Sequence, residues 1–376
     1  MQRQHYVPEW FFRLFNGGSR AIYMLRKESG TVVQGPVRID RQCFAELLYG
    51  SEEVEASLAR LEAKHALAFR SLAAIADAPL CDEVPPETLA TVAEAVLLMR
   101  LRHPDRAARH LDAFAAMEAI ASHSETLPAG AAEGSHLSGG HYTKEEAVVQ
   151  ILMQVAHALT TSLALSDLQC LILANRTDMP FLFGDNPVAL CNPYRQHIDY
   201  YGVLGWQAPG LQVHIPISPK HHLVLCDPAA YEWPRHRGCV IDVEHGGDVA
   251  QLNALQMHNA IDAIYFHDLT YAETYERLLA VHRKEMRSAG VVVKTGPLVC
   301  EGEPGHESRQ VVCMFEPHLG LKLNLTCIRS VARRPQLPSN AVRSHRLAQQ
   351  LDEVASHTSM SSLLAMLRRH AEQQGN

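Results

Sequence analysis

The chain has 376 residues, a hydrophobic content of 47% and a formal net charge of −7 at pH 7. This length is enough for at least one large hydrophobic core, and the acidic balance argues against a global attraction to nucleic acid or anionic lipid. No run reaches the ~18 apolar residues of a membrane helix, and the first residues lack the layout of a signal peptide. We therefore expect a protein with no membrane association.

The nine cysteines are widely spaced, form no CxxC pair and mostly lie within apolar runs such as LVLC and QVVCMF. Such residues are typical of buried, reduced thiols, which persist in reducing compartments. The sequence therefore predicts a cytoplasmic location.

The first predicted element is a short helix that begins at Pro8 and ends at the Asn-Gly-Gly of residues 16–18. Proline is favoured at the first helical position, and glycine ends helices. Large apolar residues such as Trp10 and Phe11 must dock this helix into the core. Gln4 and His5 precede the helix N-terminus, where unpaired N–H groups favour an anion and disfavour a charged imidazole.

Helical patterns dominate the first half of the chain. A β-hairpin is expected over 19–40, a short helical turn over 44–50, and long helices from 52 to about 79 and from 86 past 109. Pro104 should break the second long helix just after Arg102 and His103. Residues 126–141 are rich in Gly and Ser and predict a flexible loop. A further helix over 143–165 begins with a capping box of Thr143 and Glu146.

Strand patterns dominate the second half. Strands are expected over 168–174, 181–183, 188–191, 211–215, 222–226, 291–293, 310–315 and 321–328. Helices are expected over 248–263, 271–286, 341–350 and 359–370. The order predicts an α+β fold, with an N-terminal helical half and small hairpin followed by a mixed, mostly antiparallel sheet with covering helices. We expect one domain over 1–330 and a helical C-terminal extension over 331–376.

Two short apolar runs meet at Gly184-Asp185-Asn186-Pro187. An apolar strand that stops on a carboxylate and is followed by an Asn-Pro turn places a charged group at a sheet edge. Asp185 could act there as a general base or a metal ligand. It could equally close an Asx turn, because Asp and Asn are the usual turn formers before proline.

Several short motifs occur together in a fixed order along the chain. They are QHYVP at 4–8, Leu14-Phe15, Arg102-His103-Pro104, Asn175-Arg176-Thr177, Phe181, Asp185-Asn186-Pro187, PISPK at 216–220, Asp227, Tyr231 and Leu252-Asn253. Together they resemble the bacterial family catalogued as domain of unknown function 4238, over roughly residues 2 to 270. Gly184 departs from the resemblance, which leads us to expect Ser or Thr before the aspartate. The family brings no settled reaction, and its scattered distribution among bacteria is similar to that of defence-related genes.

His5 and Asp185 are the first candidate pair. An imidazole and a carboxylate could form a base and its orienting partner, or two ligands of a divalent metal. The sequence contains no HxH or HExxH spacing, so the identity of a metal stays open. The alternative is that Gln4 and His5 are polar neighbours of the docked first helix.

Arg102 and Lys220 are candidate substrate-binding residues. Arg102 could clamp a phosphate or carboxylate by a two-pronged contact. Alternatively it belongs to a solvated helix face, with Glu55 or Glu62 of the preceding helix as partner. Lys220 could close the same pocket, or it could be a turn residue after Pro219.

The sequence-based hypothesis is a hydrolase, of the phosphodiesterase or nuclease type, that acts on a phosphate-bearing substrate such as a nucleotide or nucleic acid. His5, Asp185 and Asn186 would be the catalytic residues, and Gln4, Arg102 and Lys220 would bind the substrate. The rival hypothesis is a non-catalytic protein that senses a small anionic ligand or a partner protein with the same residues. A third reading makes these residues fold determinants.

Overall fold

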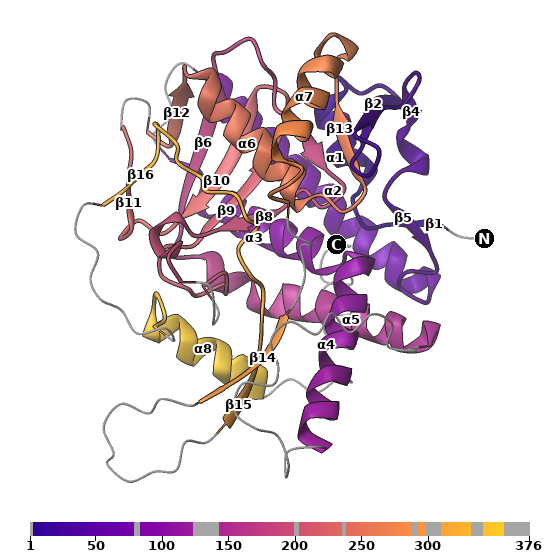
Figure 1. The fold of residues 1–376 in the computed structure, drawn as a ribbon, viewed down its shortest axis with the longest axis vertical. Helices are drawn as coiled ribbons and strands as arrows, with labels where there is room; N and C mark the ends of the chain where they lie inside the picture. Colours follow the sequence, from indigo (N-terminus) through magenta and orange to yellow (C-terminus); the bar gives the residue numbers. More distant parts are fainter. Residues whose placement is uncertain are drawn as a thin grey trace.

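The structure is a computed structural model that describes residues 3–78, 83–122, 143–198, 203–234, 238–286, 292–297, 310–331 and 341–356. Helices pack on a mixed sheet in the arrangement shown in Figure 1, which confirms the predicted α+β class. The predicted loop at 126–141 and the predicted helix at 359–370 lie outside the described residues. The division of the chain at residue 330 stays a prediction.

The main sheet has the strand order β12-β6-β10-β9-β8. β12 runs parallel to β6, and the other neighbouring pairs are antiparallel, as expected for a mixed, mostly antiparallel sheet. The strands are β6 (Gln169–Asn175), β8 (Ala189–Cys191), β9 (Gln212–Pro216), β10 (His221–Cys226) and β12 (Val240–Val243).

Both faces of this sheet are covered. Side chains alternate along a strand, so Ile172 of β6 faces one core cluster while Leu171 and Leu173 face another. The first cluster contains α2, α3 and α5, and the second contains α6. The middle layer is therefore apolar on both sides, which explains its continuous apolar strands. The helices are α2 (Glu52–Asp77), α3 (Pro86–Leu101), α5 (Lys144–Thr161) and α6 (Gly246–Asn259).

A second sheet brings together strands that are far apart in the sequence, β2 near the start of the chain and β13 at residues 263–266. The N-terminal hairpin does not stand alone, because β2 pairs with β13, and β13 pairs with β7 at the central G-D-N-P turn. α7 (Ala272–His282) packs on this sheet. The strands are β2 (Ala21–Arg26), β3 (Thr31–Val32), β4 (Val37–Arg38), β7 (Phe183–Gly184) and β13 (Ala263–Phe266).

The first helix, α1 (Glu9–Phe15), docks through its aromatic side chains, as predicted. The rings of Phe11 and Phe12 each lie 5.2 Å from the ring of Phe183, and Phe12 lies 4.9 Å from Tyr265. These edge-on contacts join α1 to strands more than 160 residues away. The start of the chain is thereby fixed against the β7 turn.

Pro104 breaks the second long helix as predicted. α3 ends at Leu101, and α4 (Pro104–Ser122) begins at the proline. Proline cannot donate the hydrogen bond that a continuous helix requires at this point. The break directs the basic residues around it inward, and Arg100, Arg102 and His103 are all buried.

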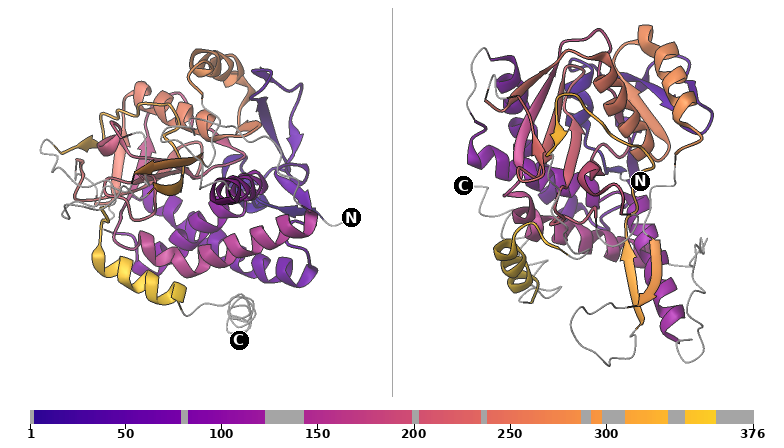
Figure 2. Two further views of the ribbon diagram at one scale, coloured as in Figure 1. Left: turned by 60° about the horizontal axis from the view of Figure 1, so that its bottom comes forward. Right: turned by 60° about the vertical axis from the view of Figure 1, so that its left-hand side comes forward.

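The segment after residue 290 begins with a hairpin. β14 (Val292–Pro297) pairs with β15 (Gln310–Phe315), and both contact α4, beside which they project in Figure 2. Residues 316–328 then run along α6 to β16 (Arg329–Ser330), which pairs with β11 (Tyr231–Glu232). α8 (His345–Ser356) contacts α5. Short 3-10 turns lie at η1 (Ile39–Arg41), η2 (Ser162–Leu165), η3 (Pro193–Arg195) and η4 (Leu269–Tyr271).

Three local predictions were wrong. Residues 44–50 contain a strand, β5 (Phe44–Glu46), which pairs with β1 (Arg3–His5), so long-range pairing overrides the local helical pattern. The predicted strand over 321–328 is irregular chain that packs its leucines on α6. The helix predicted over 248–263 ends at Asn259, because Ala263 belongs to β13.

Among the described residues, one helical segment, Lys144–Leu165, is long and apolar enough to cross a membrane by length and composition alone. α5 within it contacts α3 and α4, with Ile151 and Val155 buried in the main core. A helix packed in this way also passes a test of length and composition, so the finding is weak support for a membrane span.

Candidate functional site

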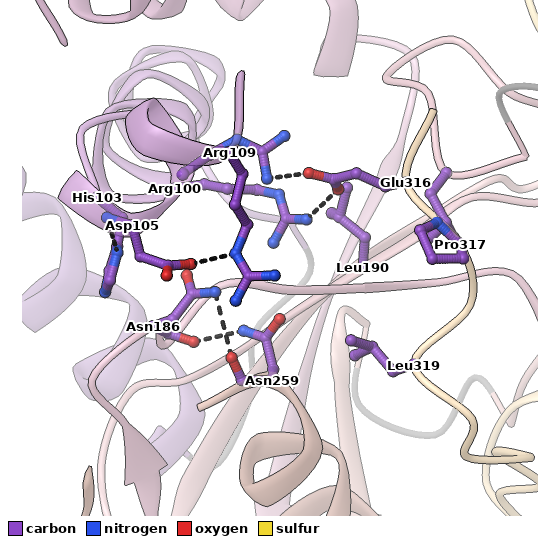
Figure 3. Close-up of a pocket in the computed structure, with 12 residues that line it drawn as sticks. Arg100, His103, Asp105, Arg109, Asn186, Leu190, Asn259, Glu316, Pro317 and Leu319 are labelled. Carbon is purple, nitrogen blue, oxygen red and sulfur yellow. Dashed lines mark hydrogen bonds and ion pairs between the residues drawn. The ribbon is translucent and has the colours of Figure 1, made fainter. Parts of the chain in front are cut away.

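A small cavity opens where the α3–α4 break, the G-D-N-P turn, the end of α6 and the segment after β15 meet (Figure 3). Its volume is about 30 Å³, which is room for roughly two water molecules. We call it the arginine cavity. Its lining residues are Arg100, His103, Asp105, Arg106, Arg109, Asn186, Leu190, Leu204, Asn259, Glu316, Pro317 and Leu319.

The centre of the cavity is a carboxylate between two arginines. Arg100 donates from Nη2 to Oε2 of Glu316 at 2.5 Å, and Arg106 pairs with the other oxygen of the same carboxylate. Burial raises the pKa of Glu316, but the charges of Arg100 and Arg106 lower it by more, to about 2. Glu316 is therefore ionised throughout the neutral range.

Arg100 is fixed from both sides. It is 5% exposed, and its Nη1 donates to the carbonyl oxygen of Val188 at 2.7 Å. Burial lowers the pKa of Arg100 to about 10 although Glu316 raises it, so the guanidinium is still charged at pH 7. The β8 end and the α3 end are thus joined by a buried cation.

His103 and Asp105 come from the helix break itself. The backbone N–H of Asp105 donates to Nδ1 of His103 at 3.2 Å, and Arg109 donates from Nε to the Asp105 carboxylate at 2.6 Å. Burial lowers the pKa of His103 to about 4, so the ring is neutral at pH 7. Because Nδ1 accepts a hydrogen bond, the proton belongs on Nε2, and this buried nitrogen has no hydrogen-bond partner.

Two asparagines form another wall. Asn186 donates from Nδ2 to the carbonyl oxygen of Asn259 at 3.3 Å, and Asn259 donates from Nδ2 to the carbonyl oxygens of Asn186 and Val188. Oδ1 of Asn186 is buried without a hydrogen-bond partner. Two residues of the cavity lining, His103 and Asn186, therefore each carry a buried polar atom that no protein group pairs.

Asp185 is not among the residues that line this cavity, and it holds the loop between α6 and β13. Its carboxylate accepts hydrogen bonds from the backbone N–H groups of Ile261, Asp262 and Ala263 at 2.7, 2.8 and 3.0 Å. Burial raises the pKa of Asp185 to about 6, and these three donors lower it in part. The contacts are those of a fold determinant, the role that the sequence left open.

Close packing at the end of α6 explains why position 184 is a glycine. A Cβ atom at this position would lie 2.7 Å from Cβ of Ala260 and 3.3 Å from the carbonyl oxygen of Gln256. The departure from the family's Ser or Thr therefore goes with close packing between β7 and the end of α6.

Gln4, His5 and Arg102 come together around Tyr49. Oε1 of Gln4 accepts from the backbone N–H of Tyr49 at 2.6 Å, and the Tyr49 hydroxyl donates to the carbonyl oxygen of His5 at 3.1 Å. Arg102 is 1% exposed and donates to the carbonyl oxygen of Tyr6 and to Glu62. Burial opposes the charge on Arg102, but Tyr49 and Glu62 raise its pKa above the usual range. The guanidinium is thus occupied by the protein itself.

His5 and Lys220 are absent from the residues that line the cavity. Nε2 of His5 is buried without a hydrogen-bond partner, and burial lowers the pKa of its ring. Lys220 is exposed in the β9–β10 turn, where its backbone N–H donates to the Ser218 hydroxyl at 3.1 Å. Among the six sequence-predicted residues, only Asn186 lines the cavity.

Sequence reasoning did not select Arg106, Arg109, Asn259 and Glu316. The available signal was the density of basic residues at 100–109, where four arginines and one histidine fall within ten positions. Asn259 and Glu316 carry no local motif and enter only through tertiary contacts. Within the described residues, no group of three or more His, Cys, Asp or Glu side chains is placed to hold a metal ion.

The fold and this site define an α+β protein with a small, arginine-lined cavity. The chain belongs to the family described as protein of unknown function (DUF4238), whose model matches residues 3–270. This confirms the family that the motifs indicated. No curated protein and no solved structure matches the chain.

Proposed function

We propose that the protein binds a small phosphate-bearing ligand at the arginine cavity. The observation that carries this proposal is a pair of arginines that share a single carboxylate, the buried Arg100 and the partly exposed Arg106. Guanidinium groups arranged in this way bind phosphate and carboxylate through strong, charge-assisted hydrogen bonds. This develops the binding hypothesis of the sequence and moves the cationic centre from Arg102 to its neighbours.

Two uncharged side chains of the lining, His103 and Asn186, add a preference for a ligand with hydroxyl groups. Nε2 of His103 can donate to a ligand oxygen, and Oδ1 of Asn186 can accept from a ligand hydroxyl. A nucleotide or a sugar phosphate carries both kinds of group beside its phosphate. Leaving such buried groups unpaired is costly, so a matching ligand gains affinity by pairing them.

Equilibrium dialysis and calorimetry with inorganic phosphate, AMP, ADP and a short oligonucleotide test the proposal, with adenosine as the uncharged control. AMP should bind and adenosine should not. Arg106→Gln should weaken AMP binding about tenfold or more, because one charge-assisted contact is lost. The matched control is Arg176→Gln, which removes an arginine paired with Asp242 on the half-exposed surface. Equal affinities in all variants, or no anion binding at all, would overturn the proposal.

Hydrolysis of the bound phosphate ester is the second candidate function. The observation in its favour is the carboxylate of Asp105, which lines the cavity and could activate a water molecule. Both carboxylate oxygens of Asp185 accept backbone N–H groups, so Asp105 replaces Asp185 as the proposed base. Phosphate release from AMP, ADP and oligonucleotides, with and without Mg²⁺ and Zn²⁺, tests this candidate. Turnover that is lost in Asp105→Asn would support it.

We also propose a cytoplasmic location. Six cysteines with described side chains are buried, unbridged thiols, which supports a reducing compartment: Cys43, Cys170, Cys191, Cys226, Cys239 and Cys327. Fractionation of cells that express the tagged protein tests this location.

A further inference from the structure

We propose that Glu316 is an internal occupant of the anion site, and that a phosphate dianion binds by displacing Glu316 and the strap to which it belongs. The strap is defined as residues Glu316–Leu319. This inference rests on the proposed function, because it concerns how the same cavity becomes available to its ligand.

The carboxylate of Glu316 occupies the donors that a ligand needs. Each of its oxygens is paired with one arginine, Oε2 with Arg100 and Oε1 with Arg106. Two oxygens of a phosphate could take the same two partners. The remaining volume of about 30 Å³ holds roughly two waters, so an added phosphate and Glu316 compete for the space.

Glu316, the carboxylate that pairs with the two arginines, lies outside residues 3–270, which the family model matches. The arginines, His103, Asp105 and both asparagines of the cavity lie within residues 3–270, whereas Glu316, Pro317 and Leu319 lie beyond them. The cavity that the family region builds is therefore closed by a separate segment. Such a segment can regulate access without belonging to the binding surface.

The strap and the chain that follows it are held by separate sets of contacts. Beyond its ion pairs, the carbonyl oxygen of Leu319 accepts from Nδ1 of His258 at 2.8 Å. Farther along, Thr326 donates from its N–H and its hydroxyl to Asp248, and Leu323 and Leu325 are buried against α6. Local release of the strap therefore leaves the anchor at 323–328 in place.

Charge selects the incoming group. Three arginines and two carboxylates line the cavity, so departure of Glu316 leaves two positive charges in excess. A phosphate monoester or inorganic phosphate dianion balances that excess, whereas a monocarboxylate leaves half of it. The preferred ligand is therefore a dianion. Comparing AMP with inorganic phosphate distinguishes an ester from the free ion.

The first test compares the phosphate and AMP affinities of wild type, Glu316→Gln and the control Glu46→Gln, which removes an exposed carboxylate of β5. Removing the internal competitor should tighten binding at least about tenfold, whereas the control should bind as wild type does. Equal affinities in wild type and Glu316→Gln, with binding still weakened by Arg106→Gln, would overturn displacement and leave the proposed function intact. Absence of anion binding in all variants would overturn both.

The second test keeps Glu316 and does not depend on the folding of Glu316→Gln. Leu319→Cys places a thiol on the strap, and its maleimide labelling is located by mass spectrometry. Saturating phosphate should speed labelling at residue 319 several-fold, because the strap leaves the cavity. An unchanged rate under saturation would overturn displacement.

Discussion

Asn186 and Asn259 hold each other by reciprocal hydrogen bonds from side chain to backbone across 73 residues of sequence. The first follows β7 at the G-D-N-P turn, and the second ends α6. Together with Asp185 and the N–H groups of 261–263, the two asparagines clasp the turn to the helix end. This clasp fixes one wall of the arginine cavity.

Loss of this clasp should destabilise the fold. Asn259→Ala removes the donor to the carbonyl oxygens of Asn186 and Val188. We expect a loss of about 2 kcal/mol in the free energy of unfolding, because the Asn186 carbonyl loses its donor while the Val188 carbonyl keeps only the contact from Arg100. Denaturant unfolding measures this loss. Asn324→Ala, at an exposed position whose backbone makes its contacts with Gln251, should have little effect.

Restoring the family's residue at position 184 should be unfavourable in this chain. Gly184→Ser places a Cβ atom 2.7 Å from Cβ of Ala260, a contact that forces the backbone to shift. We expect a cost of roughly 1–3 kcal/mol. The double variant Gly184→Ser with Ala260→Gly removes the clash and should recover part of the loss in thermal unfolding. An additive or larger loss in the double variant would contradict this explanation.

The limits of sequence reasoning follow from these contacts. The break at Pro104, the capping box at Thr143 and the docking of Phe11 and Phe15 depend on local patterns, so the sequence predicted them. The pairing of β2 with β13 and the approach of Glu316 to Arg100 depend on contacts between distant segments, which no local pattern encodes. The sequence singled out Asp185 as a carboxylate that a ligand can reach, whereas the side chain is buried and accepts from three N–H groups of 261–263, which could not be read from the turn.

Substitutions of Arg102 and Arg106 should have different effects, because Arg102 stabilises the fold and Arg106 belongs to the proposed binding site. Arg102→Ala leaves Glu62 without its partner and the carbonyl oxygen of Tyr6 without its donor. We expect a loss of about 3 kcal/mol in unfolding free energy, with unchanged AMP affinity where the variant is folded. Arg106 is 18% exposed in its side chain, so Arg106→Gln should cost less stability but weaken AMP binding. Chemical unfolding and calorimetry on both variants measure the two effects. If Arg102→Ala weakened AMP binding and Arg106→Gln did not, the anion would have to be assigned to Arg102 instead.

His103 should stay neutral well below the usual range of histidine. Its pKa is lowered to about 4 by burial, so the ring should begin to protonate only near that pH. The folded pKa lies below the unfolded value, so the stabilisation that His103 contributes is complete above about pH 6.5 and declines as the pH falls through 4. Nitrogen-detected NMR should show the Nε2–H form at pH 7. A ring that titrates near pH 6.5 would contradict the burial of this side chain.

Glu316 should make the fold sensitive to acid. Its pKa is lowered to about 2 in the folded protein by Arg100 and Arg106, against 4.5 for the unperturbed group. Because the folded pKa is the lower one, the stabilisation is complete above about pH 4.5 and is lost as the pH falls through 2. The full contribution is roughly 3 kcal/mol, of which the part between pH 4.5 and 3 is accessible to urea unfolding.

The decisive measurement is the difference between variants, since His103 also contributes to the acid response. Glu316→Gln should have a shallower loss of stability between pH 4.5 and 3 than wild type, and Glu46→Gln should follow wild type. Parallel stability curves for wild type and Glu316→Gln would mean that the carboxylate makes no net contribution to stability through the arginine pair.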